Sequence, residues 1–262
     1  MSARQIAQVV ALTLQSPPPG LTHSSTRELA RRVGLSYAMV HRIWQAHALQ
    51  PHRVETFKFT TDPAAEDKIR DIVGLYLDPP ANAAVLCVDE ETQIQALNRT
   101  QRLLPLRPGP PARQTHDCQR NGITSLSAAL EVARGRVLGA CRPRHTGADS
   151  LAFTRQVARH YPGELHFIVD NSSSHKTPAV QTWLDAHPRV HFHFTPTGAS
   201  WMNMIEAWFS VPTRKSIQRG SFDSVRALVR HIHAHLDHWN EHPVLFTWTK
   251  VADQIIAKAL RH

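Results

Sequence analysis

The stretch AAVLCVD at residues 83–89 is a continuous apolar run that ends in an aspartate. A second stretch of the same kind, LHFIVD, lies at residues 165–170. Unbroken apolar runs of this length are typical of strands that are buried on both faces of a sheet. The two runs therefore predict central strands, each of which ends in an acidic side chain, Asp89 or Asp170.

Weaker patterns place further elements around these two strands. Residues 123–132 and 136–141, split by Arg134-Gly135, predict a hairpin, and VHFHFT at 190–195 predicts another strand. Helices are expected at residues 148–160, 178–186, 201–210 and 223–240. The order strand, hairpin, helix, strand, helix, strand, helix is that of a ribonuclease-H-like fold. We therefore expect an α/β domain whose mixed five-stranded sheet has an antiparallel part, a parallel part and flanking helices.

Three acidic residues fall where this fold would gather them. Its first and fourth strands are neighbours, so Asp89 and Asp170 would emerge at one edge, and a helix across that edge would supply Glu206. Transfer of a phosphodiester develops charge on the entering and leaving oxygens, which two Mg²⁺ ions about 4 Å apart stabilise. Mg²⁺ prefers carboxylate oxygens, and Mn²⁺ accepts them as well. The pattern predicts that these three acids are catalytic and bind the metal.

Each acid taken alone also has a structural interpretation. Asp89 can be a polar strand end, with Glu90 and Glu91 behind it, and Asp170 can belong to an ordinary turn, because Asp and Asn favour turns. Catalysis is favoured by the order of all three acids together. We expect three nearby polar residues to support them, namely Asn171, His175 and Asn203.

Residues 26–45 match the spacing of a helix-turn-helix. Gly34 takes the turn position, where a positive φ is easiest for glycine, and Ser25 and Ser36 can cap the two helices. The second helix of such a motif lies in the major groove of DNA. We expect Arg31 and Arg32 to contact phosphates. The side chains expected to be exposed on this helix are Ser36, Tyr37, Ala38, His41, Arg42 and Gln45, and of these Arg42 and Gln45 have the donor geometry for base edges. The alternative is an ordinary helix pair within a larger bundle.

Charge and composition point to a polyanionic partner. The chain has 262 residues, with 30 Lys and Arg against 21 Asp and Glu, and 24 of the basic residues are arginine. The planar arginine fork suits phosphate. We expect three parts: residues 1–58, a helix-turn-helix domain with a basic linker that covers 51–63; residues 59–82, a connecting helix; and residues 83–262, the catalytic domain. Residues 99–120, with five arginines and four prolines, are expected to form an extended basic loop.

Several other classes of protein and site are disfavoured. Apolar runs fall short of the ~20 residues that span a bilayer, and no secretory signal is evident. Three cysteines without a CxxC motif indicate free thiols of a reducing compartment, so we expect a cytoplasmic, nucleoid-associated protein. His231 and His235 have the spacing of a zinc pair but lack further ligands, so a solvated helix face is favoured. The run Ser172 to His175 lacks the GxSxG motif of a serine nucleophile.

The chain resembles a known family in several segments. They are STRELARRVGLSYAMVHRIW (25–44), VDEETQIQAL (88–97), THD (115–117), VDNSSSHK (169–176), HFTPTGASWMNMIEAWFS (193–210) and WNEHPVLFTWTK (239–250). All are similar to the IS630 family of insertion-sequence transposases, within the IS630/Tc1/mariner superfamily of DDE transposases. The resemblance implies that Asp89, Asp170 and Glu206 are the metal-binding triad. It also implies Mg²⁺-dependent cleavage at the element's terminal repeats, joining to a TA target, and a homodimer on double-stranded DNA.

The chain also departs from this family in ways that leave alternatives open. Glu91 and Ser172 stand where a lysine and an aromatic residue are frequent, and Pro212 interrupts a stretch that is usually helical. Family members usually carry two tandem paired-like helix-turn-helix modules, and this sequence begins where the second one does. One alternative is a truncated, inactive or inhibitory DNA-binding relic. Another is a structure-specific nuclease of the same fold, which cuts DNA without joining it.

Overall fold

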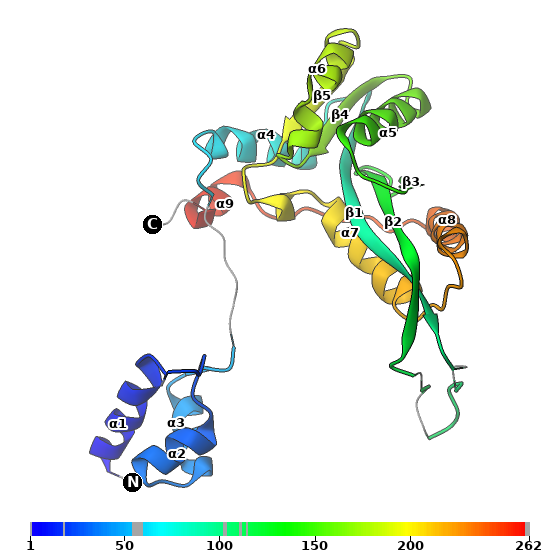
Figure 1. Cartoon of the computed structure of the whole chain (residues 1–262). Coiled ribbons are helices and arrows are strands. Elements are labelled where there is room, and N and C mark those ends of the chain that lie inside the picture. The colour runs from blue at the N-terminus through cyan, green and yellow to red at the C-terminus, as the bar shows by residue number, and fades with distance from the viewer. Residues whose placement is uncertain are drawn as a thin grey trace. The chain divides into compact units, whose positions relative to one another are not determined.

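The computed structural model describes residues 2–17, 19–53, 60–101, 104–109, 112–113 and 115–259 (Figure 1). The chain divides into two compact units, Met1–Phe57 and Lys58–His262. Residues 54–59 of the expected linker lie outside the described residues, as do Arg102, Pro110 and Pro111 of the expected basic loop. No helix in the described ranges is long and apolar enough to cross a membrane.

The first unit contains α1 (Ala3–Leu14), α2 (Thr26–Val33) and α3 (Tyr37–Ala46). The Ser25 side chain accepts a hydrogen bond from the N–H of Glu28, whose carboxylate accepts one from the N–H of Ser25, and this capping box fixes the start of α2. Gly34 ends α2 in the left-handed region, with φ of 68°. Ser36 caps α3 through the N–H of Met39. Each local signal that predicted the helix pair therefore has a physical counterpart.

A small core holds these helices together. Its fully buried members come from every helix of the unit: Val9, Leu29, Ala30, Val40, Ile43 and Trp44. The indole N–H of Trp44 donates to the hydroxyl of Thr13 at 2.8 Å, which ties α3 to α1. Leu14 is the last residue of α1 and is 71% exposed, so it does not join this core.

The second unit is built on a five-stranded sheet with the order β3-β2-β1-β4-β5. Its strands are β1 (Ala83–Arg99), β2 (Cys118–Glu131), β3 (Val137–Arg142), β4 (Glu164–Val169) and β5 (Val190–Phe194). β1, β2 and β3 pair antiparallel, whereas β4 pairs parallel with β1 and with β5. This mixed sheet with flanking helices confirms the ribonuclease-H-like fold.

The first strand is longer than the sequence predicted. β1 passes through Asp89 and continues to Arg99, and β2 begins at Cys118, so both ends of the expected 99–120 loop belong to strands. The second half of β1 buries only alternate residues, Ile94 and Ala96, and therefore lacks a continuous apolar run. Gln93, with φ of 57°, marks an irregularity in the pairing with β2.

Helices cover both faces of the sheet (Figure 1). α4 (Ala65–Leu77), α7 (Ile205–Pro212), α8 (Val225–Glu241) and α9 (Ala252–Ala259) share one apolar cluster with the sheet. α5 (Gly147–His160) and α6 (Pro178–Asp185) pack on the other face. α4 lies within residues 59–82, where a connecting helix was expected, whereas α9 was not predicted from the sequence.

The helix that carries Glu206 differs from its predicted form. Ser200–Met202 is a short 3₁₀ turn, η2, and α7 begins only at Ile205. Trp201 therefore lies outside α7 and is 49% exposed, whereas Trp208 of α7 is completely buried. Pro212 does not stop the chain from coiling, since a π-helical turn, η3 (Thr213–Ile217), follows it directly. The hydroxyl of Thr213 donates to the carbonyl of Phe209 and reinforces this junction.

Candidate active site

Asp89 and Asp170 occupy equivalent positions on neighbouring parallel strands. Cys87 of β1 is in register with Ile168 of β4, and each aspartate lies two residues further along its chain. Side chains alternate along a strand, so Asp89 belongs to the same face as Cys87, which packs in the cluster under α7. β4 ends immediately before Asp170, as predicted, whereas Asp89 lies within β1 although the sequence predicted that it ends this strand.

Glu206 reaches this face from the first turn of α7. Asn203, just before the helix, is completely buried, and its Nδ2 donates to the carbonyl of Val88 at 2.9 Å. The hydroxyl of Tyr76 on α4 donates to the carbonyl of Met202 at 2.7 Å. The first bond fastens the start of α7 to the strand residue that precedes Asp89, and the second fastens it to α4, so Asn203 has a positioning contact as expected of a supporting residue.

The three carboxylates influence one another electrostatically. Burial, followed by the charges of Asp170, Glu206 and Glu90, raises the pKa of Asp89 to about 7. Burial and then the charge of Asp170 raise the pKa of Glu206. Their oxygens do not all come within 4.8 Å of one another, so an ion held by all three acids would draw the side chains closer together. This arrangement gathers negative charge that a bound cation would relieve.

Asp170 differs from the other two acids because it has a basic neighbour. Burial opposes ionisation, but His175 and the N–H of Ser172 outweigh it and lower the pKa of Asp170. The imidazole Nε2 of His175 lies 3.4 Å from Asp170 Oδ1, and its Nδ1 lies 3.0 Å from the hydroxyl of Ser150. His175 is 2% exposed, so the ring is fixed between α5 and the sheet edge.

Asn171 contacts the loops beside the acids. Its Nδ2 donates to the hydroxyl of Thr197 at 2.6 Å, and its side-chain carbonyl accepts from the ammonium of Lys176. The N–H of Thr197 in turn donates to Asp62. Asn171 thus connects the segment after β4 with the loop after β5.

Glu91 is a fourth acid that the sequence analysis did not select. It lies two residues after Asp89 on β1 and therefore belongs to the same face of the strand. Burial and then the charge of Glu206 raise the pKa of Glu91. Its spacing of two residues from Asp89 on a strand was the available signal, but the predicted strand ended too early to reveal it.

The donor set at this edge fits a divalent metal ion. All of its ligand atoms are carboxylate oxygens, which Mg²⁺ and Mn²⁺ accept in preference to nitrogen or sulfur. Burial first, and then the charges of the neighbouring acids, raise the pKa of Asp89, and a bound cation would favour its ionised form. Asp89, Asp170 and Glu206 would hold the ion.

The residues predicted to contact DNA lie on the surface of the first unit. The exposed residues of this set are Arg31, Arg32, Ser36, Tyr37, His41, Arg42 and Gln45. Gly34 and the caps of α2 and α3 set the turn that presents them. Ala38, also expected to be exposed, is only partly exposed.

The structure also shows the surroundings of the alternative sites that the sequence raised. His231 Nε2 lies 2.8 Å from the hydroxyl of Ser216, and no described acid or cysteine joins it and His235 in a ligand cluster. Ser172 caps a short 3₁₀ helix, η1 (Ser173–Lys176), and accepts from the N–H of Ser174. The three cysteines are free.

Comparisons with known proteins agree with this geometry. Residues 84–229 match the family model described as DDE superfamily endonuclease, and this segment contains all three acids. No curated protein matches the chain.

Solved structures of Mos1 transposase have the same fold. A Mos1 paired-end complex with the left transposon end matches with a TM-score of 0.58 and 16% identity, over 91% of this chain and 71% of that one. The Mos1 strand transfer complex matches with a TM-score of 0.60, 16% identity and the same coverage, 91% and 71%. A Mos1 mariner paired-end complex with Mn matches with a TM-score of 0.57 and 16% identity, over 97% and 75%. Because the family model covers more than half of the sequence, the chain belongs to the DDE superfamily of endonucleases, as its resemblance to DDE transposases predicted.

Proposed function

We propose that this chain is the transposase of an insertion sequence, which binds the terminal repeats of its element and then cleaves and joins DNA. The observation that carries the proposal is that Asp89 and Asp170 each lie two residues beyond Cys87 and Ile168, which are in register on neighbouring strands, with Glu206 on the helix that covers the same face. The solved transposase complexes that share the fold support the same activity.

In this proposal Asp89, Asp170 and Glu206 are the catalytic and metal-binding residues. A divalent ion bound there, Mg²⁺ or Mn²⁺, would stabilise the charge on the entering and leaving oxygens of the phosphodiester. His175 and the N–H of Ser172 keep Asp170 ionised and oriented. Asn203 holds the start of α7 against β1, so that Glu206 stays on the acidic face.

DNA recognition is assigned to the helix pair of the first unit. Arg31 and Arg32 would contact phosphates. The side chains that would face base edges in the major groove are Ser36, Tyr37, His41, Arg42 and Gln45. We further propose joining to a TA target by a homodimer on DNA, because pairing of two ends needs two active sites, and a cytoplasmic, nucleoid-associated location.

The decisive experiment combines the purified chain with DNA that carries the terminal repeats of its source element. We expect Mg²⁺-dependent cleavage at the repeat and joining of the free 3′ end to a second duplex. Cleavage governed by DNA shape without joining would instead establish a structure-specific nuclease. Specific binding without cleavage in Mg²⁺ or Mn²⁺ would establish an inhibitory relic.

A further inference from the structure

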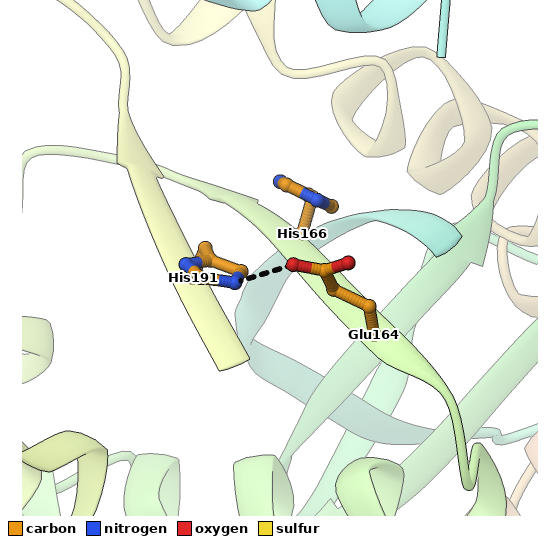
Figure 2. A group of neighbouring side chains, drawn as sticks. All are labelled: Glu164, His166 and His191. Carbon is orange, nitrogen blue, oxygen red and sulfur yellow. Dashed lines mark hydrogen bonds and ion pairs between the residues drawn. The ribbon is translucent and has the colours of Figure 1, made fainter. Parts of the chain in front are cut away.

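A second polar cluster lies on β4 and β5, at the ends of these strands opposite to the acids. Glu164 and His166 belong to β4, and His191 of β5 is in register with His166 (Figure 2). One donor atom from each of these side chains lies within 4.8 Å of the other two. The cluster includes no residue of the acidic edge.

A chain of hydrogen bonds from α4 fixes the tautomer of His166. His193 Nδ1 lies 2.6 Å from Asp71 Oδ2, and His193 Nε2 lies 2.9 Å from His166 Nδ1. A carboxylate only accepts, so with both rings neutral His193 donates from Nδ1 and accepts at Nε2. His166 must then donate from Nδ1, which leaves a lone pair on its Nε2.

That lone pair has no partner within the described part of the chain. His166 Nε2 is buried and makes no hydrogen bond there. A buried polar atom without a partner is costly, and native structures usually supply one.

The neighbouring side chains complete a donor set. His191 Nε2 lies 3.0 Å from Glu164 Oε1 (Figure 2). Two imidazoles and one carboxylate form a frequent ligand set for Zn²⁺, with a fourth position left to water. Imidazole nitrogen disfavours Mg²⁺ and favours transition metals. The carboxylate–histidine chain from Asp71 has the form of the outer hydrogen bonds that orient metal-binding histidines.

We propose that Glu164, His166 and His191 bind a divalent transition metal ion, with Zn²⁺ as the first candidate, at a site distinct from the acidic edge. His166 binds through Nε2, and His191 binds through Nε2 as the tautomer that carries its proton on Nδ1. The rings of His166 and His191 are stacked, 4.9 Å apart at 24°, so His191 must turn to aim its nitrogen. Its side chain is 40% exposed, which leaves it room to turn.

The ion would fasten the edge strand β5 to β4. β5 is the last strand of the sheet on this side. His166 and His191 are paired in register across the two strands, although the helix α6 lies between them in the sequence. Because an ion that binds only the folded chain stabilises it, the thermal midpoint of the protein should rise with Zn²⁺ concentration.

The test measures Zn²⁺ binding to the full chain by titration calorimetry in excess Mg²⁺, which occupies oxygen-only sites. We expect one Zn²⁺ per chain and a rise in the thermal midpoint. Glu164→Gln and His191→Ala, both at exposed side chains that are tolerant of change, should weaken binding at least ~10-fold. Asp71→Asn should weaken it roughly 10- to 100-fold through loss of the outer hydrogen bond. His233→Ala, an exposed histidine of α8, is the matched control and should change nothing.

Two further measurements locate the ion. Co²⁺ in place of Zn²⁺ should give the visible absorption bands of a four-coordinate site without a thiolate charge-transfer band, and His191→Ala should abolish them. Equal Zn²⁺ binding by the parent chain and His191→Ala would overturn the proposal. It would also be overturned if binding were lost in the His231→Ala, His235→Ala double variant or in Asp170→Asn, because the ion would then lie on α8 or at the acidic edge.

Discussion

The surface of α2 and α3 and the acidic edge of the sheet carry opposite charges. Arg31, Arg32 and Arg42 are exposed on the helix pair, whereas burial and then the charge of Asp170 raise the pKa of Asp89 and of Glu206. A DNA phosphate is attracted to the first region and repelled by the second until a cation binds there. Under the proposed function, recognition and chemistry therefore depend on different charges, and substitutions should separate them.

The largest separation is expected for Asp170→Asn. The change keeps the shape of the side chain but removes a charge that the metal needs, so cleavage should fall at least ~1,000-fold, about 4 kcal/mol of transition-state stabilisation. DNA binding should not change, because the helix pair is untouched. Gel-based cleavage and fluorescence anisotropy measure the two effects, with Asp237→Asn, at an exposed aspartate of α8, as the matched control. Cleavage by Asp170→Asn at the parental rate would remove Asp170 from the site.

The two regions also differ in how well the sequence predicted them. The helix pair depends on local signals, namely the Ser25 cap, the left-handed Gly34 and the spacing of the apolar residues, and all three were legible. The sheet edge depends on two buried strands that were equally legible, since a parallel pair in register delivers Asp89 and Asp170 together.

What the sequence did not reveal depends on contacts between distant segments. The outer half of β1 alternates between buried and exposed residues and lacks a continuous apolar run. The predicted strand therefore ended at Asp89, and Glu91 was missed. The hydrogen bond from Asn203 to Val88 joins residues 115 positions apart. The sequence does not reveal this bond, and α7 was predicted to start too early. The cluster of His166, His191 and His193 appears only when β5 is placed in register with β4.

The second prediction sharpens the comparison within the helix pair. Arg42 should read a base edge, so Arg42→Ala should cost ~1–3 kcal/mol on the terminal repeat and little on random DNA. Arg32→Ala, the matched control, should weaken both DNAs alike and lower the salt slope by about 0.9. Binding isotherms on both DNAs at several salt concentrations measure this. An equal loss on both DNAs for Arg42→Ala would place Arg42 among the phosphate contacts.

The third prediction concerns the tip of the β1–β2 hairpin, which we propose contacts DNA or a second subunit. Leu104 and Leu106 are 62% and 75% exposed there. Among the described residues of the tip, Leu104 and Arg113 form an isolated antiparallel β-bridge. Deleting residues 104–112 should spare the core and reduce paired-end joining roughly 10-fold, ~1.4 kcal/mol. Cleavage of single ends should persist. Joining at the parental rate would refute the contact, and the control Arg107→Ala keeps the length of the tip while removing one charge.

The smallest effect should distinguish the two units by their response to acid. Asp62 is 6% exposed, and burial opposes its ionisation. The ammonium of Lys68 at 2.6 Å and the N–H groups of Thr197 and Ala64 outweigh burial and lower its pKa to about 2.

A carboxyl whose pKa is lower in the folded chain stabilises the fold above its unfolded pKa, near 4, and loses that contribution as the pH falls towards 2. Asp62→Asn should therefore destabilise the second unit by about 1–2 kcal/mol at pH 7, after allowance for solvent screening, and by progressively less below pH 4. The first unit should not respond to this substitution, since Lys68, Ala64 and Thr197, which contact Asp62, all belong to the second unit. Urea unfolding at pH 7 and pH 3 measures the difference, with Asp67→Asn, at an exposed residue of α4, as control. A loss of stability that is the same at both pH values would show that Asp62 acts through its shape and not through its charge.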